Sequence, residues 1–245
     1  MNATPSTSKT MHTTNEITWP RTDPWSYKEL VTILVLIFGL VPWLIESRLH
    51  NWLTEIFNNT FYSGISTGLV MGVVFTFSVY LITLLPNRLG WCEIGIRSFP
   101  LQYSMHIAFW SVIVLVVSVL ILFVMSLFGG SYENSKTESI QSHLSVYTLL
   151  LGILSAGILS PIYEELLYRG FLYRWCRTRF GRGWALFLSS FIFMIAHIPT
   201  YNTLALNLAA GLIFAWTYEK TQSVIPGIIV HGVTNTIFVL LTFIA

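Results

Sequence analysis

The chain has 245 residues, of which 54% are hydrophobic and only 10% are charged, whereas soluble domains carry about 25% charged residues. This composition excludes an ordinary soluble domain and predicts a membrane protein embedded in the lipid bilayer. The formal net charge of +2 is too small for a nucleic-acid-binding surface, so we expect no nucleic-acid partner. The two cysteines, Cys92 and Cys176, predict neither a disulfide framework nor a cysteine metal site.

The first 28 residues are rich in Ser, Thr, Asn and Pro. They lack the basic segment, apolar run and small-residue cleavage site of a signal peptide. We predict that residues 1–28 form a disordered cytoplasmic tail.

The apolar stretches that follow are suited to crossing a bilayer, which takes about 20 residues each. We predict an all-α transmembrane bundle of about seven spans, at residues 30–45, 61–85, 103–128, 144 to about 173, 184–198, 203–218 and 224–244. After the first span, residues 49–57 place apolar side chains on one helical face and polar ones on the other. This pattern predicts an amphipathic helix in the membrane interface.

The basic residues predict the orientation of this bundle, because cytoplasmic loops carry an excess of Lys and Arg. With seven spans, one side carries Lys9, Arg21, Lys28, Arg88, Arg97, Arg174, Arg177, Arg179, Arg182 and Lys220, and the other carries Arg48 and Lys136. We therefore expect a multi-pass protein with a cytoplasmic N-terminus and an external C-terminus.

Three charged residues, Glu164, Glu165 and Arg169, lie inside the fourth predicted span. A charge near the centre of a membrane helix costs about 2.5–3.5 kcal/mol, so these residues need partners or a function. Glu165 and Arg169 are four residues apart and can form an ion pair on one helical face. Glu164 lies about 100° around the helix from Glu165 and must face another polar group.

Polar residues in two later spans are the candidates to face Glu164. They are His197 and, on one face of the last span, His231 with Asn235. At about 1.5 Å per residue from the cytoplasmic ends, Glu164 lies about 15 Å deep, His197 about 21 Å and His231 about 14 Å. The matching depths predict one buried polar site that opens toward the cytoplasm. Alternatively, the charged pair and the histidines only hold helices together.

The motifs Glu164-Glu165-x-x-x-Arg169, Phe193-x-x-x-His197 and His231-x-x-x-Asn235, in this order on three spans, resemble those of the CPBP family of intramembrane proteases. This family includes the type II CAAX prenyl endopeptidases and the abortive-infection-like proteins. The similarity covers about residues 144–245, which we interpret as a CPBP-like catalytic core preceded by N-terminal spans and the interfacial helix at residues 29–143. The resemblance implies a protease of a bacterial plasma membrane.

The resemblance also implies a role for each motif residue. Glu164 would activate the attacking water beside His197, and His231 with Asn235 would stabilise the oxyanion, while Glu165 and Arg169 would orient Glu164. The family is customarily grouped with metalloproteases, and Glu164, His197 and His231 would supply a ligand set known for catalytic zinc. Glu165 would then be the likelier base. We favour a metal-free glutamate mechanism, and zinc stays open as an alternative cofactor.

Two other classes of function compete with a protease. Intramembrane Glu, His and Arg also mark the pathways of ion- or proton-coupled transporters, although no inverted repeat is visible. A non-catalytic immunity or scaffold protein could keep the same fold. For a protease, the partner is a peptide or membrane-protein substrate, and the sequence does not choose between CAAX-type processing and other substrates.

Overall fold

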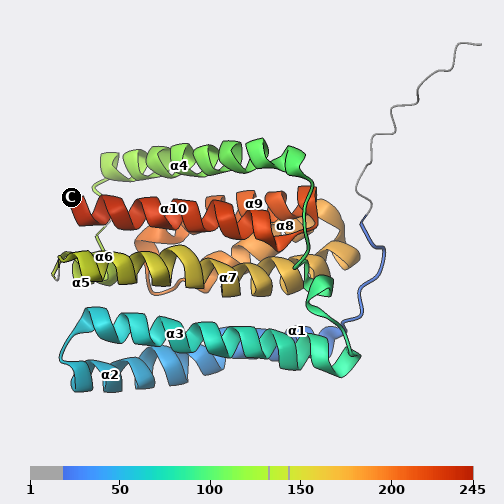
Figure 1. Cartoon of the computed structure of the whole chain (residues 1–245), viewed down its shortest axis with the longest axis horizontal. Helices are drawn as coiled ribbons and strands as arrows, with labels where there is room; N and C mark the ends of the chain where they lie inside the picture. The colour runs from blue at the N-terminus through green and yellow to red at the C-terminus, as the bar shows by residue number, and fades with distance from the viewer. Residues whose placement is uncertain (1–18, 132, 143, 245) are drawn as a thin grey trace, which may run out of the picture.

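Most helices run along one common direction, and no strand occurs in the residues that the structure describes (Figure 1). This computed structural model describes residues 19–131, 133–142 and 144–244. The predicted all-α fold is confirmed. Helices suit a chain in lipid because each one satisfies its own backbone hydrogen bonds.

The helical elements fall into two groups along the chain. The first group contains α1 (Tyr27–Val35), η1 (Leu36–Leu49), α2 (His50–Phe57), α3 (Thr60–Ser78), η2 (Val79–Leu84), η3 (Leu85–Asn87), η4 (Trp91–Ile94), η5 (Leu101–Tyr103) and α4 (Ser104–Leu127). The second group contains α5 (Ser135–Gln141), α6 (Val146–Gly152), η6 (Ile153–Leu159), α7 (Ser160–Glu165), η7 (Leu166–Tyr173), α8 (Arg174–Ile195), η8 (Tyr201–Thr203), α9 (Leu204–Thr221) and α10 (Val224–Ile244).

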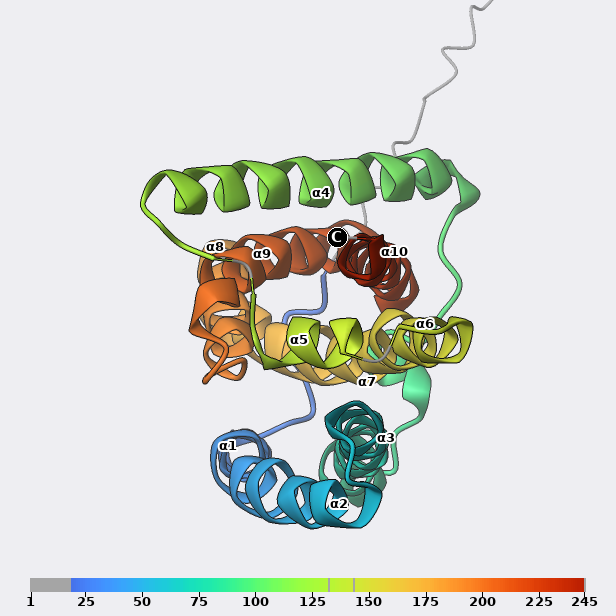
Figure 2. The ribbon, with the colours of Figure 1, turned by 90° about the vertical axis from the view of Figure 1, so that its left-hand side faces the viewer.

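The helices form layers when the bundle is viewed from its end (Figure 2). The hairpin of α1–α2 with α3 lies on one side, and the helix that runs from α6 to η7 lies next to it. Beyond that helix lie α9 and α10, and α4 crosses obliquely over their outer side. The motif-bearing helices therefore occupy the middle of the bundle.

The predicted interfacial helix is not a separate element. Residues 49–57 continue the first helix, which runs without a break from Tyr27 to Phe57, and Leu49 keeps ordinary helical dihedral angles of φ −66° and ψ −43°. On the side that meets α3, Thr54 donates to Ser63 at 2.9 Å, while Arg48, Asn51 and Glu55 are exposed. The position of this segment in the membrane interface stays a prediction.

The predicted disordered tail is wrong for residues 19–28, while residues 1–18 lie outside the described residues. Trp25 is only 2% exposed, and its indole nitrogen donates to the carbonyl of Thr83 at 2.8 Å. Trp19 packs edge-on against Tyr173 and Tyr218. The polar composition of residues 1–28 predicted a disordered segment, but these two tryptophans bury enough apolar surface to hold it against the bundle.

The count of seven spans is not confirmed. Five helices in the described residues are long and apolar enough to cross a membrane, namely Tyr27–Phe57, Thr60–Asn87, Leu101–Leu127, Val146–Ile195 and Val224–Ile244. The fourth contains two predicted spans and is interrupted at Gly181, where φ is 76°. The rings of Tyr168 and Phe193 lie 5.1 Å apart on either side of this break, so the chain reverses there. The segment predicted at residues 203–218 begins at the last residue of η8 and otherwise lies in α9, which is not among the five.

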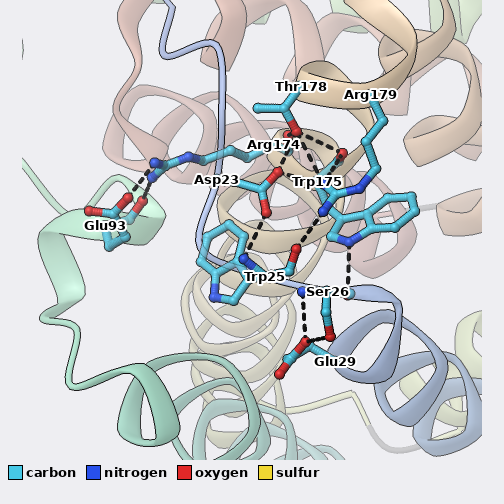
Figure 3. Close-up of polar contacts among 9 residues, drawn as sticks. All are labelled: Asp23, Trp25, Ser26, Glu29, Glu93, Arg174, Trp175, Thr178 and Arg179. Atoms are coloured by element: carbon cyan, nitrogen blue, oxygen red, sulfur yellow. Dashed lines mark hydrogen bonds and ion pairs between the residues drawn. The ribbon is translucent and has the colours of Figure 1, made fainter.

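Several basic residues gather at one end of the bundle, which we call the basic end. It combines residues 19–28, the loop around η4, the start of α8 and the end of α9. Figure 3 shows two of its ion pairs, Arg174 with Glu93 and Arg179 with Asp23. A third joins Arg177 to Glu219 at 3.0 Å. These pairs tie the segment before α1 and the η4 loop to the helices that follow the motif, while the cytoplasmic orientation stays a prediction.

Candidate functional site

The predicted ion pair between Glu165 and Arg169 is present at the centre of the bundle. Glu165 ends α7 and Arg169 lies one turn later in η7, so their side chains share one face. Arg169 Nη1 lies 2.9 Å from Glu165 Oε1, and both side chains are 0% exposed. A fully buried pair of this kind loses the hydration of both charges, so its remaining contacts must compensate.

The Arg169 guanidinium is enclosed by a carbonyl and two aromatic rings. Its Nη2 donates to the carbonyl of Gly211 in α9 at 3.0 Å. The guanidinium carbon lies 4.7 Å from the ring centre of Phe193 and 5.3 Å from that of Phe214. Cation–π attraction and the hydrogen bond stabilise the charge and fix the direction in which Glu165 is held.

His231 lies between the two glutamates. Its Nδ1 is 3.1 Å from Glu165 Oε1, and its Nε2 is 3.7 Å from Glu164 Oε2. The imidazole stacks on Phe214, with ring centres 4.4 Å apart and planes at 19°. The predicted meeting of Glu164 with a polar residue of the last span is therefore seen, and Glu165 shares the same histidine.

Glu164, like Glu165, has a buried Oε2 atom without a hydrogen-bond partner within the described residues. Glu164 Oε1 accepts a hydrogen bond from the Ser160 hydroxyl. Glu164 Oε2 faces His231 Nε2 at a distance that is too long for a direct hydrogen bond. Sequence reasoning missed Ser160, although its i, i+4 spacing to Glu164 was a usable signal.

Glycines bring the motif-bearing helices close together. A Cβ on Gly232 would lie 2.5 Å from the carbonyl oxygen of Gly157, and a Cβ on Gly227 would lie 2.9 Å from Glu165 Oε2. Side chains at either position would separate α10 from the helix that carries the glutamates. The close approach of these backbones, which motif spacing does not reveal, places His231 within reach of both carboxylates.

His197 and Asn235 make their hydrogen bonds to backbone carbonyls. His197 Nδ1 lies 2.8 Å from the carbonyl of Phe193, and its ring contacts the Phe193 ring at 4.6 Å between centres. The same Phe193 ring lies 6.0 Å from that of His231. Asn235 donates to the carbonyl of Ala156 at 3.0 Å. Within the described part of the chain, neither residue hydrogen-bonds to a glutamate of the site.

The zinc alternative is not supported by the donor arrangement. Within the described ranges, no three His, Cys, Asp or Glu side chains gather closely enough to hold a metal ion. The predicted ligands Glu164, His197 and His231 therefore do not fit a metal site in this conformation.

Fold and site together define a multi-pass helical membrane protein with a buried cluster of two glutamates, an arginine and a histidine. Residues 145–237 match the family model described as "Type II CAAX prenyl endopeptidase Rce1-like", and this range contains all three motifs. The resemblance to the CPBP proteases is thereby confirmed.

A curated relative supports the same family. The protein named "Putative membrane peptidase YdiL" of Bacillus subtilis (strain 168) is 29% identical over 114 residues, which make up 46% of this chain and 46% of the relative. The chain thus spans about half the length of the relative that it matches. No solved structure shows a significant match.

Proposed function

We propose that this protein is an intramembrane endopeptidase in which Glu164 activates water for attack on a peptide bond. The observation that carries the proposal is the unpaired Oε2 of Glu164, which is buried and lies 3.7 Å from His231 Nε2. A water that lies beside both atoms would contact a proton acceptor and a polarising group at once. The family resemblance over residues 145–237 supports the same chemistry.

The proposed reaction begins when Glu164 removes a proton from this water. The resulting hydroxide adds to the carbonyl carbon of the substrate, and the carbonyl oxygen takes the negative charge. Glu164 then returns the proton to the leaving nitrogen as the carbon–nitrogen bond breaks. One carboxylate thus serves as general base and then as general acid, a role worth about 10²–10⁴ in rate.

Glu165, which is held by Arg169, fixes the orientation of the His231 ring and the proton on its Nδ1. Because Glu165 Oε1 accepts from Nδ1, that nitrogen carries the proton and Nε2 points toward Glu164. In the proposed reaction His231 acts with protons on both ring nitrogens, because only an Nε2 proton can stabilise the oxyanion.

His197 and Asn235 take supporting places in this proposal. The bond of His197 Nδ1 to the Phe193 carbonyl makes Nδ1 the donor and leaves Nε2 as an acceptor for water or substrate. Asn235 uses its amide on Ala156 and so positions α10. This assignment differs from the oxyanion role that the resemblance implies for Asn235.

The substrate class that we propose is a peptide or membrane protein whose scissile bond enters the bilayer. Processing of prenylated CAAX peptides is one candidate, which the name of the matching family model supports.

The experiment is cleavage of a panel of reporter substrates, including a prenylated Cys-a-a-X peptide, by the purified full chain in liposomes. We expect cleavage by wild type, a loss of at least a hundredfold in Glu164→Gln, and partial recovery in Glu164→Asp. Equal cleavage by wild type and Glu164→Gln would refute the proposal. A proton-dependent uptake that Glu164→Gln abolishes, without cleavage, would instead assign a carrier.

A further inference from the structure

An apolar groove lies on the outer surface of the bundle, on a different face of α9 from the buried cluster of Glu164, Glu165, Arg169 and His231. It has a volume of about 350 Å³ and is lined only by apolar and aromatic side chains from α4, α8 and α9. Among them are Phe109 of α4, Leu186 of α8, and Leu212 and Trp216 of α9. The volume is within the range of ligand sites, about 300–1,000 Å³.

Two cations lie at one end of this groove. Arg182 and Lys220 both approach the ring of Trp216, at 5.9 Å and 4.6 Å from its centre. Both are exposed, and within the described residues neither has a carboxylate partner within 4 Å. They differ in this from Arg174, Arg177 and Arg179 of the basic end, each of which has an acidic partner.

The arrangement follows from the sequence of α9. Leu212, Trp216 and Lys220 are spaced four residues apart and form one stripe that leads from the apolar part of the helix to its last turn. The opposite side of α9 carries Phe214, which stacks on His231. The groove lies beside this stripe, where α4 and α8 pack against α9.

We propose that this groove binds an anionic phospholipid, with an acyl chain along the stripe and the phosphate between Arg182 and Lys220. The lining is apolar, which matches a hydrocarbon chain, and the two unpaired cations match a negatively charged headgroup. Trp216 connects the two parts, because it lines the groove and lies beneath both cations. Amphipathic aromatic side chains of this kind favour the boundary between hydrocarbon and headgroups.

The test uses the delipidated full chain in detergent, with bound lipids counted by native mass spectrometry and stability followed by thermal unfolding. Phosphatidylglycerol, phosphatidylcholine with the same acyl chains, and sodium phosphate are added separately. We expect wild type to retain one phosphatidylglycerol in preference to phosphatidylcholine and to unfold at a higher temperature in its presence. Sodium phosphate alone should produce neither effect.

Three variants separate the charge from the groove. Arg182→Gln with Lys220→Gln should weaken phosphatidylglycerol binding about thirtyfold, since each cation near a membrane surface contributes about 1 kcal/mol. Leu212→Trp fills an exposed part of the groove, keeps both cations and should also abolish retention. The control, Arg21→Gln with Lys28→Gln, removes two exposed cations elsewhere on the basic end and should bind as wild type does.

Three outcomes would overturn the proposal. An equal loss in the control variant would show diffuse attraction to the whole basic end. Equal retention of phosphatidylcholine would show an unspecific apolar surface. Competition by sodium phosphate, together with normal binding by Leu212→Trp, would show an anion site that needs no acyl chain.

Discussion

The adjacent glutamates Glu164 and Glu165 have different partners, so replacing each by glutamine should separate stability from catalysis. Glu165 is paired with Arg169, and both side chains are 0% exposed. Glu165→Gln leaves the guanidinium buried without a counter-charge, a change that costs about 3–5 kcal/mol. Within the described residues, Glu164 forms no ion pair with Arg169, and the amide oxygen of a glutamine can still accept the hydrogen bond from Ser160. Glu164→Gln should therefore cost less than about 1 kcal/mol.

For the rate of cleavage, Glu164→Gln should have the larger direct effect of the two substitutions. Glu164→Gln removes the proton acceptor itself, so the properly folded variant should lose about 10²–10⁴ in rate. Glu165→Gln should reduce cleavage in proportion to the fraction of protein that remains folded, with a further loss because His231 Nδ1 loses its charged partner.

The assay combines thermal unfolding of the purified full chain in one detergent with cleavage of a reporter in liposomes. Glu93→Gln is a matched control, because Glu93 also pairs with an arginine, Arg174, but its side chain is 32% exposed. The loss of stability in Glu93→Gln should be smaller than in Glu165→Gln, because the Glu93 carboxylate is partly solvated and Arg174 keeps its hydrogen bond to the Glu93 backbone carbonyl. The reasoning fails if Glu164→Gln unfolds as early as Glu165→Gln, or if it cleaves at the wild-type rate.

Two further substitutions test how α10 is positioned. Gly232→Ala places a Cβ 2.5 Å from the Gly157 carbonyl oxygen. The free energy of unfolding should fall by about 1–3 kcal/mol, and the rate of cleavage should fall about a hundredfold because His231 shifts. The control is Gly64→Ala, whose Cβ meets nothing within 4 Å and should change neither measurement. Asn235→Ala removes a donor to a backbone carbonyl of η6 and should lower the free energy of unfolding by about 1–3 kcal/mol. Its rate of cleavage should fall less than that of His231→Gln. A loss of cleavage equal to that of His231→Gln, at unchanged stability, would assign Asn235 to the reacting groups instead.

The helical fold and the location of the charged cluster were predictable because unpaired polar groups are costly in lipid. A glutamate or arginine inside an apolar span needs a partner, and the i, i+4 spacing of Glu165 and Arg169 identified that partner correctly. Residues 49–57 were predicted to form a separate interfacial helix, whereas they continue the first long helix without a break. Helical periodicity records which face is polar, and it does not show where a helix begins.

By itself, the sequence determined the membrane class, the helical architecture, the family resemblance and the residues that must be buried together. Only the tertiary structure decided that His231 contacts both glutamates, that Glu164 keeps a free oxygen, and that Asn235 bonds to a backbone carbonyl. It also showed that Trp19 and Trp25 anchor a segment predicted to be a tail. The physical reason is that burial cost depends on a residue's own chemistry, whereas partner choice depends on how closely the helices approach. That approach is governed by contacts such as Gly157 against Gly232.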